Sequence, residues 1–355
     1  MQRSNSKTQL VEQTQKLRSL ILLLPAFAED FFRGISEVKQ IRTRISYAHD
    51  MRIFFEYLLN NHPSFDSYES IHDFSVDDLE TVTAIDIEKY TEYLTAYSSE
   101  DKNGVTKVFS NTAPGKNRKM SSLRSFYKYF YRKEVIRTNP TLLVDLPKLR
   151  ERAVVRLDPN ESADLLDAVE EGTNLSERQK LFHEKNKQRD LALVTLLLGT
   201  GIRVSECVGL DINDVDFSNN SFLVTRKGGD QEILFMPEEV AQALTKYVNE
   251  ERKEMLKNTQ TDPGALFLSL RRSRLTVSSI EKMVKKYALT AVPLKNISPH
   301  KLRSTFGTNL YRETNDIYLV ADVLGHKDIN TTRRHYVTMD EDRKKQAAKV
   351  TKLRD

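Results

Sequence analysis

The sequence predicts a mainly α-helical protein with one small β-sheet, organised in two domains. Its length of 355 residues exceeds the ~100–200 residues typical of one domain. Apolar side chains recur at helical spacing along most of the chain, whereas 221–236 consists of two short β-rich runs around Gly228-Gly229, which is typical of a hairpin. The basic stretch 141–157, which contains Pro147, separates the two halves and indicates an interdomain linker.

The first half of the chain is helical in pattern. Residues 1–40 are expected to form a helical extension, in which 17–32 is an amphipathic helix that packs on the first domain. Residues 41–140 are expected to form that domain, and Thr83 is a plausible N-cap for one of its helices. Three segments of this domain place apolar residues along one helical face: 43–61, 84–97 and 116–136.

The last of these helices carries a basic side. With one residue of the linker it supplies the candidate DNA contacts, which are Lys116, Arg118, Lys119, Arg124, Lys128, Arg132 and Lys148. The net charge of +5 and the pI of about 9.0 allow an anionic partner without requiring one. The plainer interpretation is a solvated helix face.

The second domain is expected to span residues 158–338. A helix should start near Asn160, and 189–210 should form an apolar helix, a Gly-Thr-Gly break and a second helix. Ser298 and Pro299 are a good entry to another helix. The charged, insertion-like segment 171–188 suggests no function, and 339–355 has the pattern of a C-terminal helix.

Composition excludes several classes of protein. The single cysteine, Cys207, rules out an intramolecular disulfide framework and a zinc site of several cysteines, and it fits a reducing cytoplasmic location. No apolar run approaches the ~18–20 residues that span a bilayer, so no membrane partner is expected. There is no Walker-type phosphate loop and no clear set of metal ligands, so neither a cofactor nor a metal is expected.

Six residues form a set suited to phosphodiester chemistry without a metal. They are Arg203, Lys227, His300, Arg303, His326 and Tyr336. Guanidinium groups bind nonbridging phosphate oxygens, a lysine or histidine can protonate a leaving oxygen, and a tyrosine hydroxyl can attack phosphorus. Each residue alone has a plainer explanation, since a lone arginine is usually a solvated charge and a tyrosine usually a packing ring. Their order and local context taken together favour catalysis.

The motifs that carry these residues resemble those of the tyrosine recombinases, the family of phage integrases and Xer-type recombinases. They occur in the family's order: GTGIRVSE (199–206), RKGGDQEILFMP (226–237), HKLRSTFGTNL (300–310), LGHKDINTT (324–332) and Tyr336. Residues 121–148 are similar to the end of the family's core-binding domain and its linker. The resemblance therefore covers nearly the whole chain from about residue 40.

The resemblance implies a role for each residue of the set. Arg203 and Arg303 would bind phosphate, Lys227 would protonate the 5′-oxygen, and His300 would assist proton transfer at the nucleophile. His326 would hydrogen-bond the scissile phosphate, and Tyr336 would form a 3′-phosphotyrosine. Two departures stand out. Ser304 occupies a position where the family often has a second histidine, and Tyr336 follows His326 by ten residues, where many Xer proteins have nine.

The resemblance also implies an architecture and an activity. A SAM-like helical core-binding domain and a mixed α/β catalytic domain would form a C-shaped clamp around duplex DNA. The expected enzyme is a site-specific recombinase acting through a phosphotyrosine and a Holliday junction, in chromosome dimer resolution or in integration and excision of a mobile element. A homotetramer would hold two short inverted-repeat sites, with an accessory or activating protein as a further partner, and the tail 339–355 would dock on a neighbouring subunit.

Three alternatives stay open at this point. A type IB topoisomerase-like nicking-closing enzyme uses similar chemistry, but the two-domain order and the Leu-Gly-His motif at 324–326 favour a recombinase. A DNA-binding protein derived from a recombinase would be expected to lose the catalytic set first. An unrelated phosphoryl-transfer enzyme would need a metal or nucleotide site.

Overall fold

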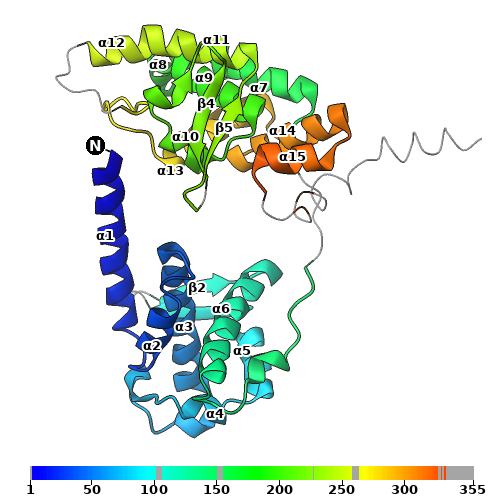
Figure 1. Ribbon diagram of the computed structural model, residues 1–355. Helices are drawn as coiled ribbons and strands as arrows, with labels where there is room; N and C mark the ends of the chain where they lie inside the picture. Colours follow the sequence, from blue (N-terminus) through cyan, green and yellow to red (C-terminus); the bar gives the residue numbers. More distant parts are fainter. Residues whose placement is uncertain are drawn as a thin grey trace, which may run out of the picture. The chain divides into compact units, whose positions relative to one another are not determined.

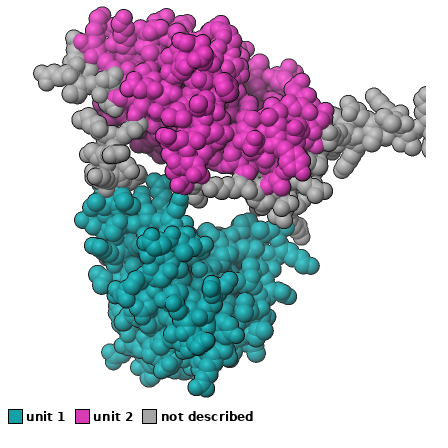
Figure 2. Space-filling model, in the orientation of Figure 1, with its two compact units in different colours: residues 1–151 teal, residues 152–355 magenta. Residues whose placement is uncertain are grey.

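The computed structural model divides the chain into two compact units, residues 1–151 and 152–355 (Figures 1 and 2). Each unit has its own hydrophobic core. The residues that the structure describes are 2–100, 106–149, 155–226, 228–257, 264–326, 329 and 332.

The first unit is built mainly of helices, as the sequence predicts. Its elements are α1 (Gln2–Ile21), α2 (Ala28–Gly34), α3 (Ile41–Asn61), η1 (Pro63–Phe65), η2 (Ile71–Asp73), α4 (Asp78–Thr81), α5 (Ala84–Tyr93), β1 (Ala96–Glu100), β2 (Thr106–Ser110), α6 (Ala113–Arg132) and η3 (Pro140–Leu142). The three helices expected in this domain are present as α3, α5 and α6 (Figure 1). Thr83 is the N-cap of α5, where its side chain accepts a hydrogen bond from the Asp86 amide.

Two predicted helices of this unit have the wrong extent. The segment 17–32 is not one helix, because the chain leaves α1 at Ile21 and begins α2 only after Pro25, which cannot continue the hydrogen-bond ladder. The segment 84–97 is helical only to Tyr93, and the chain then forms β1, which pairs antiparallel with β2. The Asn111 side chain donates to the Leu94 carbonyl at 2.7 Å, so a residue beyond the hairpin satisfies the end of the helix.

Aromatic rings fill the core of the first unit. Phe31 packs edge-to-face on Phe126 and Phe54 on Tyr90, each pair at 5.1 Å between ring centroids. One carboxylate, Asp50, is buried among them with 1% of its surface exposed. The ring contacts tie α2 to α6 and α3 to α5, and Asp50 of α3 accepts a hydrogen bond from Ser122 Oγ of α6 at 2.5 Å, so the helix with the basic side is held from several elements.

The second unit combines helices with a small antiparallel sheet of order β3-β4-β5. Its elements are α7 (Pro159–Glu171), α8 (Glu177–His183), α9 (Lys187–Thr200), α10 (Val204–Gly209), η4 (Ile212–Asp214), β3 (Val215–Asp216), β4 (Ser221–Thr225), β5 (Gln231–Phe235), α11 (Glu238–Tyr247), the π-helical η5 (Val248–Arg252), α12 (Lys253–Leu256), α13 (Val277–Ala291), α14 (Pro299–Thr314) and α15 (Ile317–Leu324). The expected helix break, the hairpin and the helix entry at Pro299 are all confirmed.

Helix α9 forms the centre of the second unit, and its apolar residues are buried on nearly every side. Gly201 ends this helix with φ +61°, and Cys207 lies buried in the short helix that follows. Burial raises the pKa of the Cys207 thiol to about 12. None of the helices in the described ranges is long and apolar enough to cross a membrane.

The insertion-like segment 171–188 contains α8 and contributes a buried histidine. His183 lies 3.0 Å from the Tyr287 hydroxyl, which in turn donates to Asp190 at 2.9 Å. Burial lowers the pKa of His183. The insertion is therefore anchored on α13 by a polar contact in the interior of the unit.

Candidate active site

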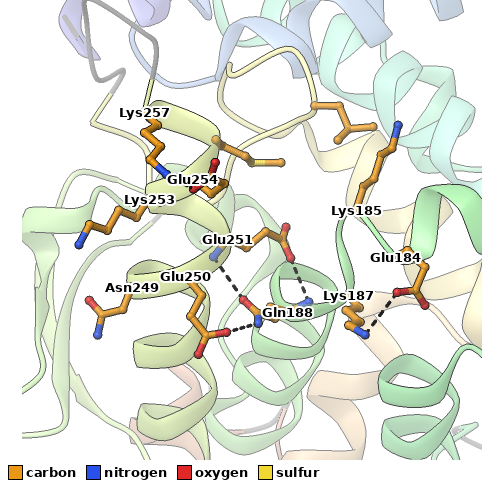
Figure 3. A pocket seen from close by; sticks show the side chains of 12 residues that line it. Glu184, Lys185, Lys187, Gln188, Asn249, Glu250, Glu251, Lys253, Glu254 and Lys257 are labelled. Carbon is orange, nitrogen blue, oxygen red and sulfur yellow. Dashed lines mark hydrogen bonds and ion pairs between the residues drawn. The ribbon is translucent and has the colours of Figure 1, made fainter.

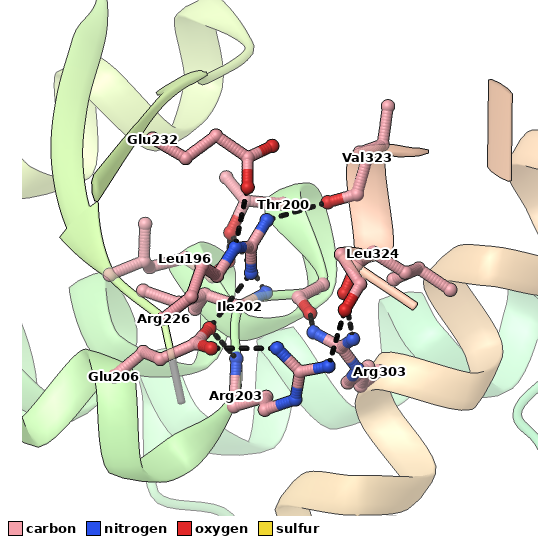
Figure 4. A network of polar contacts seen from close by, with 12 residues as sticks. Leu196, Thr200, Ile202, Arg203, Glu206, Arg226, Glu232, Arg303, Val323 and Leu324 are labelled. Atoms are coloured by element: carbon pink, nitrogen blue, oxygen red, sulfur yellow. Dashed lines mark hydrogen bonds and ion pairs between the residues drawn. The ribbon is translucent and has the colours of Figure 1, made fainter. Parts of the chain in front are cut away.

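Three arginines from three different elements converge on the C-terminal end of α15 (Figure 4). Arg226 donates to the Val323 carbonyl, Arg303 to the Leu324 carbonyl and Arg203 to the Gly325 carbonyl. The last carbonyls of a helix have no partner within the helix, and its C-terminal end carries partial negative charge. The three arginines thus supply both the hydrogen-bond donors and the positive charge that the C-terminal end of α15 lacks.

Arg303 is the more deeply buried of the two arginines predicted to bind phosphate. It lies on α14, is 4% exposed, and donates from Nη1 to the Gly201 carbonyl at 2.6 Å. Its second amino group donates to Leu324. Both acceptors are neutral carbonyls, so these contacts fix the guanidinium without neutralising its charge.

Arg203 lies at the start of α10 and is held by a carboxylate of the same helix. Its Nη1 donates to Glu206 at 2.7 Å, its backbone amide donates to the other oxygen of Glu206 at 3.1 Å, and its Nη2 donates to the Gly325 carbonyl at 2.9 Å. Because 31% of its side chain is exposed, Arg203 presents a charged group to solvent. Glu206 therefore braces Arg203 through both of its carboxylate oxygens.

Arg226 belongs to the site but was not among the predicted residues. It follows β4 and is buried, with hydrogen bonds to Glu232 at 2.7 Å and to Glu206 at 3.0 Å. Burial opposes its charge, but the bonds and charges of the two glutamates outweigh burial and raise the pKa of Arg226. The sequence signal is weak, because an arginine two positions before Gly228-Gly229 resembles an ordinary turn residue.

The two histidines occupy different settings. His300 is in the first turn of α14 and is exposed, and its carbonyl accepts a hydrogen bond from Ser304 Oγ at 3.0 Å. His326 directly follows Gly325, and its ring Nδ1 lies 2.7 Å from Thr332 Oγ1. Thr332 is fully buried, so this contact fixes the imidazole next to the three-arginine cluster.

The structure thus brings two of the predicted residues together just before His326: Arg303 donates to the Leu324 carbonyl and Arg203 to the Gly325 carbonyl. Lys227 and Tyr336, the predicted acid and nucleophile, lie outside the described residues. Glu206 forms ion pairs with both Arg203 and Arg226, and Glu232 forms one with Arg226. Such a cluster can bind a phosphate and stabilise charge that develops on its oxygens.

The basic side chains predicted to contact DNA fall into two groups. Lys128, Arg132 and Lys148 are exposed. The others make contacts within the first unit: Lys116 with Thr95, Arg118 with Asp50, Lys119 with Asn111, and Arg124 with the carbonyls of Thr141 and Val144. Burial lowers the pKa of Lys119, which is 8% exposed. Sequence reasoning missed these internal contacts.

A separate pocket of about 860 Å³ in the second unit is lined by both acidic and basic residues (Figure 3). Gln188 bonds to both Glu250 and Glu251. Its backbone NH donates to the Glu251 carboxylate at 3.0 Å, and its side-chain NH₂ donates to the Glu250 carboxylate. Its side-chain oxygen accepts from the Glu251 backbone NH at 3.2 Å. Burial raises the pKa of Glu251 to about 7. In the part of the chain that the structure describes, no group of three or more His, Cys, Asp or Glu residues could hold a metal ion.

Comparisons with known proteins agree on one family. Residues 155–343 match the model of the phage integrase family. The tyrosine recombinase XerC of Caldanaerobacter subterraneus subsp. tengcongensis is 33% identical over 343 residues, covering 94% of this chain and 88% of that protein. The tyrosine recombinase XerS of Streptococcus uberis is 32% identical over 340 residues, covering 90% of this chain and 93% of that protein.

A solved structure supports the fold. The XerH site-specific recombinase bound to its palindromic difH substrate, in a post-cleavage complex, aligns with a TM-score of 0.65 at 20% sequence identity. The alignment covers 87% of this chain and 79% of that chain.

Proposed function

The chain belongs to the phage integrase family and is a tyrosine recombinase, an enzyme that cuts and rejoins DNA in site-specific recombination; we propose which residues carry the reaction and how the enzyme assembles on DNA. One observation carries the assignment of residues. The guanidinium groups of Arg203 and Arg303 are fixed on consecutive carbonyls at the end of α15, directly before His326. This arrangement supports a phosphate-binding site at the place where the motifs converge.

In the proposed reaction the scissile phosphate binds Arg203, Arg303 and His326. The Tyr336 hydroxyl forms a bond to phosphorus while the bond from phosphorus to the 5′-oxygen breaks. The tyrosine gives its proton to His300, and the leaving 5′-oxygen takes a proton from Lys227. Because the phosphotyrosine conserves the bond energy, a 5′-hydroxyl of a second duplex can attack it and restore a phosphodiester without a metal or nucleotide.

The first unit is proposed to be the core-binding domain, corresponding to residues 41–140 after a helical extension, 1–40. The second unit would contain the catalytic domain, 158–338, joined through the linker 141–157, and the two would close around duplex DNA. Exposed Lys128, Arg132 and Lys148 are the best placed of the predicted residues to contact phosphates. If they do, affinity for DNA should fall steeply with salt, because each neutralised phosphate releases counterions.

The proposed assembly is a homotetramer that holds two short inverted-repeat sites and exchanges strands through a Holliday junction. The tail 339–355, outside the described residues, would dock on a neighbouring subunit. Deleting 345–355 should then weaken the pairing of sites or misregulate cleavage while leaving monomer binding mostly intact. Unchanged recombination by the truncated protein would contradict this role.

The biological role is proposed to be chromosome dimer resolution or movement of a mobile element, in the cytoplasm and with an accessory or activating protein as a further partner.

Covalent capture tests the proposal directly. The full chain is incubated with a library of nicked random duplexes, the mixture is denatured, and the attached DNA is sequenced, with Tyr336→Phe as the matched variant. We expect attached DNA with a paired inverted motif from the wild type and none from Tyr336→Phe, which should still bind DNA.

Three other results would contradict it. Tight, salt-sensitive binding without any adduct would favour a DNA-binding protein. Adducts together with plasmid relaxation but no strand exchange would favour a topoisomerase-like activity. Loss of binding in Tyr336→Phe would make the tyrosine structural.

A further inference from the structure

We propose that Arg226 is a positioning residue of this recombinase: it anchors the β4–β5 hairpin to the site and thereby places the turn that carries the next residue, Lys227. This inference rests on the proposed function, in which Lys227 protonates the leaving 5′-oxygen. Arg226 itself is 8% exposed, so its role is to hold the hairpin rather than to bind phosphate.

The guanidinium of Arg226 joins three elements that are far apart in sequence (Figure 4). Its Nε donates to Glu232 on β5 at 2.7 Å, its Nη1 to Glu206 on α10 at 3.0 Å, and its Nη2 to the Val323 carbonyl on α15 at 3.1 Å. Each of its three nitrogens therefore has an acceptor, which uses the fixed fork of donors that arginine offers. A lysine has one nitrogen and cannot reach three such positions at once.

The backbone of Arg226 closes the hairpin turn. Its amide donates to the Asp230 carbonyl at 2.7 Å, and its carbonyl accepts from the Gly229 amide at 3.0 Å. Lys227 is the next residue, and consecutive Cα atoms are about 3.8 Å apart across a trans peptide bond. Arg226 is therefore fixed at both backbone and side chain, which holds the base of the turn between Arg226 and Asp230.

The other side of the anchor is built to receive Arg226. Gly325 has φ +58°, and a Cβ atom at this position would lie 2.9 Å from both Cζ and Nε of Arg226. Glycine is thus required both by its backbone conformation and by the approach of the guanidinium. Glu206 links the anchor to the phosphate-binding group, because it also accepts from Arg203 at 2.7 Å.

The test compares two substrates for each variant. Full-length Arg226→Met and Arg226→Lys are assayed beside Arg178→Met, a matched change at an exposed arginine of α8. Nicked duplexes carrying the sequence that the wild type captures are made with an ordinary scissile phosphate or with sulfur in place of the bridging 5′-oxygen. When Tyr336 attacks the second substrate, the bond from phosphorus to sulfur breaks and a thiolate leaves, which needs no proton.

We expect Arg226→Met to slow covalent complex formation on the ordinary phosphate by roughly 10²-fold, the loss typical of a misplaced catalytic group. Most of this loss should disappear on the sulfur-bridged substrate, and Arg226→Lys should show the same pattern with a smaller loss. Arg178→Met should match the wild type on both. No loss in the Arg226 variants, or an equal loss on the two substrates, would overturn the inference. If Arg226→Met does not fold, the Arg226→Lys comparison decides by the same criterion.

Hydrogen exchange of the free protein gives a second readout that needs no cleavage. Peptides covering residues 221–235 should exchange faster in Arg226→Met or Arg226→Lys than in the wild type and in Arg178→Met, because the turn loses its anchor. Unchanged exchange would overturn the anchoring role. Hydrogen exchange can be compared even if the wild type captures no DNA. Failure to capture DNA would refute the proposed function, whereas the exchange rates alone would still test whether Arg226 anchors the hairpin.

Discussion

Replacing Gly201 with alanine should disturb the site without removing any catalytic group. Gly201 ends α9 with φ +61°, and its carbonyl accepts the 2.6 Å hydrogen bond from Arg303. A Cβ atom added here would lie 2.4 Å from Cδ1 of Phe306 and 3.0 Å from Cδ2 of Leu324. Phe306 is on the same helix as Arg303, so relief of this overlap must move the helix or the ring.

The expected cost follows from two terms. A non-glycine residue in the left-handed region costs about 1–2 kcal/mol, and an overpacked interior typically costs about 1–3 kcal/mol. Alanine also lowers the entropy of the unfolded chain, which offsets roughly 0.4–1 kcal/mol. The net loss of unfolding free energy should be about 1–5 kcal/mol, with a central value of roughly 3 kcal/mol. Cleavage should slow by roughly 10²-fold, since displacements near 1 Å at a catalytic group have this effect.

Gly209→Ala is the matched control. Among the described residues, apart from its chain neighbours and the backbone of its own helix, no atom lies within 4 Å of the position of its added Cβ, and the residue is helical. This change should alter stability by less than about 1 kcal/mol, in the stabilising direction. Unfolding free energies from urea titration and single-turnover rates of adduct formation are compared for both variants. Equal stability and equal rates for the two variants would refute the reasoning from Gly201.

Three further changes test other parts of the structure. Burial raises the pKa of Glu251 to about 7 from its ordinary 4.5. Between these two pH values the folded protein keeps a proton on Glu251 that the unfolded chain releases. The stability that Glu251 contributes is therefore fully present below pH 4.5 and is lost as the pH rises to about 7. Glu251→Gln should therefore gain stability over the wild type across that range, and a constant difference in urea titrations would contradict it. Asp50→Asn should cost about 1–2 kcal/mol of unfolding free energy, which is less than the ~3–5 kcal/mol lost when a fully buried ion pair is broken. The loss is smaller because 52% of the Arg118 side chain is exposed and can be hydrated again. A loss of more than about 2 kcal/mol in thermal unfolding would contradict this. Arg303→Lys should slow cleavage by roughly 10²–10³-fold in single-turnover assays, since one ammonium group cannot replace both guanidinium contacts; a wild-type rate would exclude the role proposed for Arg303.

Elements governed by local signals were predictable from the sequence. The Gly-Thr-Gly break between α9 and α10, the hairpin around Gly228-Gly229 and the entry of α14 at Pro299 all depend on residues adjacent in the chain. The β1–β2 hairpin was not predicted, because the pairing of Tyr97 with Phe109 depends on a partner twelve positions away. Its sequence also continues the helical pattern of α5.

The candidate site shows the same division. Arg203 and Arg303 were found by their motifs, and the structure places them on one helix end. The role of Arg226 could not be found in this way, since its partner Val323 lies 97 positions along the chain. The internal contacts of Arg118 and Arg124 were missed for a similar reason, because a basic helix face looks the same in sequence whether it meets solvent, DNA or a neighbouring carboxylate.

The burial of the single cysteine has a practical consequence. Cys207 is 1% exposed, and with a thiol pKa of about 12 it carries almost no thiolate at neutral pH. Maleimide dyes and thiol-reactive spin labels should therefore not react with Cys207 in the folded protein. A cysteine introduced at an exposed position such as Val108 of β2 would be labelled selectively in the otherwise natural sequence, so fluorescence could follow the enzyme on DNA without first building a cysteine-free background.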